Sequence, residues 1–347
     1  VLLVGPRAVG KTTTRRQGAA ETTQPDGPNA AAVRADPGAA LRDRPEPLLI
    51  DEWQAVPEVL GAVKRALDLP GGSRPGRFLL TGSVRDELTD AGATWPGTGR
   101  LHRRRLFGLT VREALGRADG PGLVERAVTG GDLSAADDPP DLSGYVELAL
   151  RGGFPVPVLE IADEGARRIW FEGYLDQLVA RDLQQLAGFT TREPVRLRQL
   201  VQAYAAHSAG TVADTTLLDQ VGISRPTLRV WERMLEAVFF VDVVPAWRAR
   251  LAHRLTAAPK RFVVDPGLWA AALGLQRTGV LRDGGVLGRA LETFVFSQLR
   301  AEQDWSAVNH RLHHLRSRDG REIDVVAELT DGRLVLIEVK ATAAPTP

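Results

Sequence analysis

A loop bracketed by two glycines and followed by lysine and threonine opens the chain. Gly5 and Gly10 enclose four residues, and Lys11 and Thr12 follow at once. Such glycines let backbone N–H groups curl around an anion, while the lysine reaches the β- and γ-phosphates and the threonine holds Mg²⁺. The pattern predicts a phosphate-binding loop for ATP, the alternative being a structural glycine turn. The residues expected to bind the nucleotide are Gly5, Pro6, Arg7, Ala8, Val9, Gly10, Lys11, Thr12 and Thr13.

An apolar run that ends in two carboxylates follows the loop. Leu48–Ile50 has the composition of a buried strand, and Asp51 and Glu52 close it. Beside a phosphate loop, Asp51 is predicted to hold Mg²⁺ together with Thr12, and Glu52 to polarise the attacking water. The alternative is a polar strand end that caps the next helix.

A third apolar run and a basic segment complete this set. Phe78–Leu80 leads into Thr81-Gly82-Ser83, and we expect Ser83 to contact the γ-phosphate or the water, because Thr81 still belongs to the strand. Arg100 is the arginine that we expect to act on a neighbouring subunit, which implies a homo-oligomer formed through this domain. The alternatives are an ordinary turn for Thr-Gly-Ser and a solvated basic face around Arg100.

Composition and periodicity divide the chain into five segments. Alternating apolar runs and helical stretches predict a parallel α/β sheet at the start, with an edge strand at 31–34. Helical spacing of apolar residues dominates after residue 142. The expected segments are a phosphate-loop α/β domain (1–118), a linker or mobile insertion (119–141), a helical region (142–200), a winged-helix domain (201–270) and a small α/β domain (286–347).

A helix–turn–helix is predicted near the middle of the chain. Gly222 separates two helical stretches, Ser224 has the side chain of an N-cap, and Pro226 suits a first helical turn. The run 238–244 is expected to be a strand, which together with the two helices predicts a winged helix. Few base-reading side chains follow Ser224, so contact with nucleic acid and a structural or protein-docking role both stay open.

Acidic residues and a lysine gather around the last two predicted strands. Asp324 begins one strand, Glu338 and Lys340 end the next, and Glu292 lies on the preceding helix. This arrangement resembles the core of the restriction-endonuclease-like fold, which implies that an acid and a Glu-x-Lys motif collect a divalent metal and activate water. The alternative is a degenerate core kept for binding or assembly.

Composition excludes several classes of protein. The 347 residues include 44 basic and 43 acidic side chains, so the net charge of +1 gives no field over the whole chain that would favour nucleic acid. Without cysteine there is neither a disulfide framework nor a cysteine-ligated metal. No apolar run approaches 18 residues, and we expect a soluble cytoplasmic protein. Because Val1 already lies in a predicted strand, we also expect a segment upstream of it.

The ordered series of motifs resembles the prokaryotic AAA-type ATPases fused to a C-terminal domain of unknown function. Trp53 departs from the pattern, because that family usually has an aliphatic residue there. The resemblance implies an ATPase domain whose nucleotide state controls a winged-helix and nuclease-like half. The alternatives are an ATP-regulated metal-dependent nuclease and a nucleotide-gated regulator without hydrolysis. The motifs are Gly5–Thr12, Leu49–Gln54, Leu80–Ser83, Gly99–Arg100, Arg151–Pro155, Tyr174–Leu175, Arg181–Leu183, Phe262–Leu268, Gly288–Glu292, Arg321–Asp324 and Glu338–Lys340.

Overall fold

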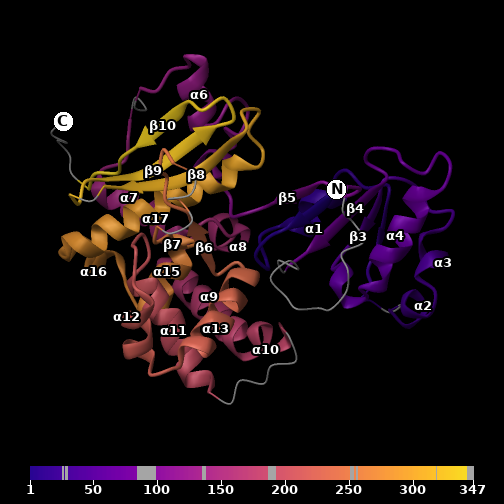
Figure 1. The fold of residues 1–347 in the computed structure, drawn as a ribbon, viewed down its shortest axis with the longest axis horizontal. Coiled ribbons are helices and arrows are strands. Elements are labelled where there is room, and N and C mark those ends of the chain that lie inside the picture. The colour runs from indigo at the N-terminus through magenta and orange to yellow at the C-terminus, as the bar shows by residue number, and fades with distance from the viewer. Residues whose placement is uncertain are drawn as a thin grey trace. The chain divides into compact units, whose positions relative to one another are not determined.

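Two compact units make up the chain, Val1–Leu106 and Phe107–Pro347 (Figure 1). The computed structural model describes residues 1–347 except 26, 28–29, 84–98, 135–137, 187–192, 251–253, 255–256, 318 and 342–347. Within this described part, no helix is long and apolar enough to cross a membrane.

The first unit is built on a parallel sheet of five strands. The strands β1 and β3 and the first three residues of β4 are apolar, and all residues of these strands are buried, so this sheet forms the core of the unit. The sheet order places β4 between β1 and β3. Because these strands are parallel, the carboxyl ends of β1, β3 and β4 lie side by side along one edge of the sheet. In sheet order the strands are β2 (Glu21–Thr23), β3 (Leu48–Ile50), β4 (Phe78–Gly82), β1 (Leu2–Val4) and β5 (Arg103–Arg105).

Helices complete the first unit, and one of them corrects a sequence prediction. The run 31–34, expected to be an edge strand, lies in helix α2, and the edge strand is β2 instead. Three consecutive alanines favour a helix, whereas β2 is a short polar strand that is defined by pairing with β3. The helices are α1 (Lys11–Arg16), α2 (Ala30–Ala35), α3 (Pro37–Leu41), the 3₁₀ turn η1 (Trp53–Ala55) and α4 (Glu58–Asp68).

The second unit contains a helical core that includes the helix–turn–helix. Helices α12 (Asp214–Val221) and α13 (Arg225–Ala237) confirm that motif, with Gly222 at φ 68° and Ser224 capping α13. The antiparallel pair β6 (Val241–Val244) and β7 (Lys260–Val263) follows. One apolar cluster runs through this motif and the helices around it. Those helices are α7 (Leu142–Arg151), α9 (Glu164–Gln177), the π-helical η3 (Leu178–Asp182), α10 (Leu183–Gln185), α11 (Pro194–Ala206), α15 (Pro266–Leu273) and α16 (Arg277–Arg282). The short helix α8 (Pro155–Leu159) follows α7 along the chain.

The chain ends in a helix and an antiparallel sheet. Helix α17 (Gly284–Gln303) packs against β7 and against the sheet that is made of β8 (His310–Arg316), β9 (Glu322–Leu329) and β10 (Leu334–Ile337). A second apolar cluster, which includes Phe296 of α17 and Val325 of β9, fills the space between the helix and this sheet.

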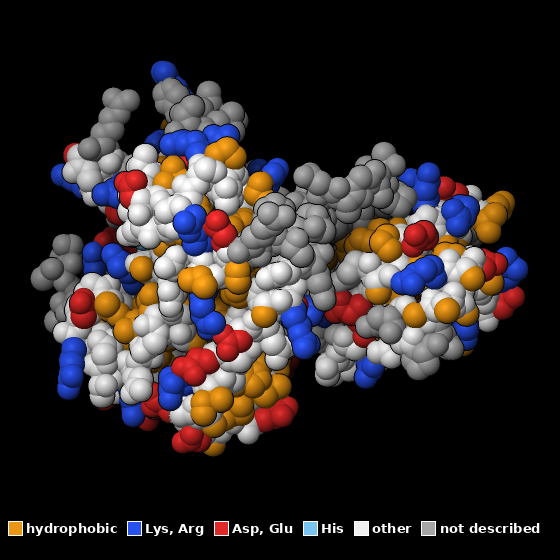
Figure 2. Space-filling model, turned by 90° about the horizontal axis from the view of Figure 1, so that it is seen from below, with side chains coloured by type: hydrophobic (Ala, Val, Ile, Leu, Met, Phe, Trp, Pro, Cys, Tyr) orange, Lys and Arg blue, Asp and Glu red, His pale blue; other side chains and the backbone are white. Residues whose placement is uncertain are grey.

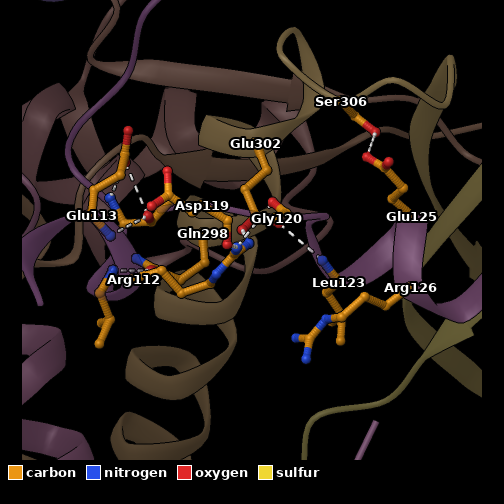
Figure 3. Close-up of polar contacts among 12 residues, drawn as sticks. Arg112, Glu113, Asp119, Gly120, Leu123, Glu125, Arg126, Gln298, Glu302 and Ser306 are labelled. Carbon is orange, nitrogen blue, oxygen red and sulfur yellow. Dashed lines mark hydrogen bonds and ion pairs between the residues drawn. The ribbon is translucent and has the colours of Figure 1, made fainter. Parts of the chain in front are cut away.

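The start of the second unit is fastened to α17 by polar contacts (Figure 3). The first of these elements is α5 (Val111–Ala114), and α6 (Leu123–Thr129) lies inside the segment 119–141 that was expected to be a linker. Glu302 accepts from Arg112 Nη1 at 2.9 Å and from Leu123 N at 3.1 Å. Val124 of α6 is buried in the C-terminal cluster. This helix is short and its flanks are rich in Gly and Asp, so apolar periodicity in the sequence did not predict it.

Candidate nucleotide site

Lys11 is held inside the glycine-bracketed loop. Its side chain is 5% exposed, and Nζ donates to the carbonyl oxygens of Gly5 at 3.1 Å and Pro6 at 2.7 Å. Burial lowers the pKa of Lys11 to about 8, although the carboxylates of Glu52 and Asp51 oppose this effect. An ammonium that is nearly removed from water can bind a phosphate oxygen strongly.

The loop backbone depends on its glycines. Gly10 precedes α1 with φ at 91°, and Ala8 also has a positive φ of 58°. A Cβ atom at Gly5 would lie 2.0 Å from the carbonyl oxygen of Leu106, so only glycine fits there without a shift of the backbone. Positive φ angles and a close approach to a neighbouring backbone are the features that a loop needs in order to curl its N–H groups around an anion.

Asp51 joins the ends of β1, β3 and β4. Its Oδ1 accepts a hydrogen bond from Thr12 Oγ1 at 2.9 Å and another from Thr81 Oγ1. Asp51 is 4% exposed. Thr12 and Asp51 therefore place a hydroxyl and a carboxylate oxygen side by side, and these are the hard oxygen ligands that Mg²⁺ takes.

Glu52 is the most tightly oriented carboxylate of the site. Its backbone lies in the left-handed region, with φ 52° and ψ 50°, which costs a residue with a side chain about 1–3 kcal/mol. Ser83 Oγ donates to Glu52 Oε1 at 2.7 Å, and Gln54 Nε2 donates to Oε2 at 2.6 Å. The Glu52 amide donates to Thr81 Oγ1 at 3.2 Å. Strain and three hydrogen bonds together fix where this carboxylate points.

The structure brings together most of the residues that were predicted for this site. Lys11, Thr12, Asp51, Glu52 and Ser83 meet at one edge of the sheet through the contacts given above. Pro6 and Val9 are buried, and the exposed side chains of the loop and of the first turn of α1 are those of Arg7, Ala8, Thr13 and Thr14.

Arg100 makes its contact away from these residues, and two further polar side chains lie in the site. Arg100 Nε donates to Asp68 Oδ1 at 2.8 Å, so its guanidinium lies at the C-terminal end of α4. Thr81 and Gln54 contact the two carboxylates directly, although sequence reasoning assigned them no role. Thr81 was not expected in the site because it belongs to a strand. The last side chains of a strand, however, can face the sheet edge at which the site lies.

The predicted residues of the C-terminal segment are only partly brought together. Carboxylate oxygens of Glu292 and Asp324 lie within 4.8 Å of each other and of Glu322. Lys340 instead pairs with Glu338, two residues before it in the sequence. Sequence reasoning missed Lys260, which lies among the three carboxylates. The rarity of lysine, with only four in the chain, draws attention to Lys260 but does not indicate the carboxylates around it.

Comparison with known protein families matches three segments of the chain. Residues 1–115 match the AAA domain, residues 142–279 match a domain of unknown function (DUF8612), and residues 287–347 match another (DUF4143). The second match spans the helical region and the helix–turn–helix, which share one apolar core.

Two curated relatives match the whole chain. The uncharacterized proteins Rv2008c of Mycobacterium tuberculosis and Mb2031c of Mycobacterium bovis are each 30% identical to it over 351 residues, covering 100% of this chain and 71% of each relative. The chain belongs to their family. Its first 115 residues form an AAA domain with the parallel sheet of the P-loop ATPases.

Solved structures give a more distant likeness. The Walker-type ATPase paby2304 of Pyrococcus abyssi aligns with a TM-score of 0.46 and 15% identity, covering 78% of this chain and 90% of that one. A RuvB mutant of Thermotoga maritima aligns with a TM-score of 0.29 and 19% identity, covering 76% and 83%. These scores are too low to support a functional argument.

Proposed function

We propose that the AAA domain binds ATP with Mg²⁺ and hydrolyses it. The observation that carries this proposal is the convergence of Lys11, Thr12, Asp51 and Glu52 at one sheet edge, with each carboxylate oriented by hydrogen bonds. Phosphoryl transfer depends mainly on positioning and on electrostatic stabilisation, and this edge offers a buried ammonium, oxygen ligands and an oriented carboxylate.

Each residue then has a distinct role. Lys11 binds the β- and γ-phosphates, and the backbone of the loop binds the same phosphates through N–H groups. Thr12 and Asp51 would hold Mg²⁺, which neutralises charge on the phosphate oxygens when bound. Glu52 accepts a proton from the attacking water, and Ser83 holds Glu52 in place and lies where it can sense the γ-phosphate. Arg100 of one chain is proposed to serve a neighbouring one after leaving Asp68.

Nucleotide binding is tested with Lys11→Ala. Removal of the buried ammonium should abolish ATP binding, which equilibrium titration with a fluorescent ATP analogue measures. Lys64→Ala is the matched control, because Lys64 is exposed on α4 and should leave affinity unchanged. Unchanged ATP turnover in Lys11→Ala would end the proposal.

A second function, contact with nucleic acid, is favoured by the surface of α13. Arg225, Arg229 and Arg233 recur every four residues and are exposed, so they form one stripe on the second helix of the helix–turn–helix. Arg225 also lies 3.6 Å from Asp214, an exposed pair that is worth little. Figure 2 shows basic and acidic side chains interspersed over the visible face, so a local stripe must supply the attraction.

Salt dependence tests this second function. We propose that the stripe contacts phosphates, so each arginine changed to glutamine should weaken binding of labelled duplex DNA about equally for all sequences and lower the salt slope by about 1. Arg282→Gln, an exposed arginine of α16, is the control. Equal affinity of the triple variant and the parent would reject this role and favour a protein partner or a structural role for the motif.

A further inference from the structure

Three carboxylates converge between α17 and the C-terminal sheet. Glu292 comes from α17, and Glu322 and Asp324 come from β9, with oxygens of all three within 4.8 Å of one another. Such a group is the part of a nuclease-like core that would collect a divalent cation. Whether it can do so depends on what else occupies the space between these oxygens.

The ammonium of Lys260 occupies that space. Lys260 is the first residue of β7, its side chain is 1% exposed, and Nζ forms ion pairs with Glu292, with Glu322 at 2.6 Å and with Asp324 at 3.6 Å. These three contacts place the ammonium among the carboxylates, so the cluster contains a cation supplied by the chain itself.

The backbone and the surroundings of Lys260 hold it near the carboxylates. Backbone pairing of β7 with β6 fixes its main chain, with Lys260 opposite Val244. The ammonium also lies 5.8 Å from the centre of the Phe262 ring, and Phe262 stacks on Phe296 of α17. A divalent ion at the three carboxylates would therefore share a partly buried space with the ammonium, which repels it.

The Glu-x-Lys motif has other contacts. Lys340 Nζ pairs with Glu338, and both side chains are well exposed, at 52% and 40%. Asp324 Oδ2 accepts from the Val339 amide at 2.8 Å, so one of its oxygens is used to hold the chain after β10. The donors present thus do not fit the metal centre that the resemblance to nucleases implies.

We infer that Lys260 takes the place of the metal ion, and that Glu292, Glu322 and Asp324 form a closed charge cluster that excludes divalent cations. The cluster ties β7, which belongs to the segment with the helix–turn–helix, to α17 and β9. Metal-dependent cleavage at this place is then absent, and the C-terminal segment serves as a rigid support for the helix–turn–helix. This inference does not depend on the proposed ATPase activity.

Manganese binding to the full chain tests this inference. Nucleotide-free protein carrying Asp51→Asn, which removes the carboxylate of the AAA site, is titrated with Mn²⁺ and free ion is measured by electron paramagnetic resonance. We expect this protein to bind Mn²⁺ no more tightly than the same protein that also carries Asp324→Asn. Mn²⁺ binding that Asp324→Asn abolishes would overturn the inference, and this comparison requires no change at Lys260.

Substitution of Lys260 tests the cause of the exclusion. In the same background, Lys260→Met should create one Mn²⁺ site with at least tenfold higher affinity than any in the parent, and adding Asp324→Asn should remove it. Lys260→Arg keeps the positive charge and should gain no Mn²⁺ site. Lys64→Met, on the exposed face of α4, should gain none either. A folded Lys260→Met protein that gains no site would contradict the role of the ammonium.

Discussion

Replacement of Thr81 by valine tests whether its hydroxyl orients both carboxylates of the AAA site. Valine has the shape of threonine but no hydroxyl, and Thr81 is fully buried, so packing changes little. The substitution removes the donor to Asp51 and the acceptor for the Glu52 amide, which is paired at 3.2 Å. Thr12 still donates to Asp51 at 2.9 Å, so the aspartate keeps one of these two partners.

The magnitude follows from these two contacts. Loss of a hydrogen bond to a charged group costs about 1.5–3 kcal/mol, and a buried N–H left without a partner costs about 1–3 kcal/mol. Allowing for relaxation of the turn, we expect the free energy of local opening around β3 and β4 to fall by roughly 3 kcal/mol, which is about 150-fold in the opening equilibrium. ATP affinity should fall as well, because Asp51 and Glu52 lose their fixed positions.

Hydrogen exchange of the full chain followed by mass spectrometry measures this change. Peptides that cover Leu48–Glu52 and Phe78–Ser83 should exchange about two orders of magnitude faster in Thr81→Val. Thr22→Val on β2 makes the same chemical change in a partly exposed strand of the same sheet. It should alter the free energy of local opening by less than about 0.5 kcal/mol. Wild-type protection in Thr81→Val would refute the role of this hydroxyl.

Two further predictions concern a pH profile and a buried cap. Because burial lowers the pKa of Lys11 to about 8, the ammonium loses its charge as the pH rises through that value. ATP affinity measured by titration should then weaken up to tenfold per pH unit above pH 8 in the wild type, but not in Lys11→Arg. An affinity of the wild type that does not change with pH would contradict this. Asp265→Ala removes the N-cap of α15 and the acceptor for the buried Gly153 amide, which lies 2.7 Å away, and should lower the free energy of unfolding in urea by about 2–4 kcal/mol. Asp283→Ala is the control, because Asp283 caps α17 with the same two helix contacts but is exposed, and its loss should cost about 1 kcal/mol. Equal costs would show that the Gly153 contact adds nothing.

The sequence predicted the parts of the fold that short motifs determine. Each of the three strand ends carries its polar residues next to an apolar run, so Lys11, Asp51 and Ser83 could be placed on one sheet edge before any coordinates. The caps and the glycine turn of α12 and α13 are likewise local signals.

Features that depend on distant segments could not be predicted in this way. Strand β2 exists because it pairs with β3, and α6 because Val124 enters the C-terminal cluster. Lys260 reaches its carboxylates through the packing of β7 near β9 and α17, and nothing in the residues next to it indicates those neighbours.

Single-turnover hydrolysis by Glu52→Gln tests the central claim most directly. Glutamine keeps the size of the side chain, and Ser83 can still donate to its carbonyl oxygen, but an amide cannot accept the proton of the attacking water. We expect ATP affinity within about threefold of the wild type and a rate of Mg²⁺-dependent hydrolysis lower by about 10²–10⁴-fold. Wild-type turnover in this variant would contradict the assignment of Glu52 as the base, and absence of turnover in the wild type itself would leave a nucleotide-gated regulator in place of an ATPase.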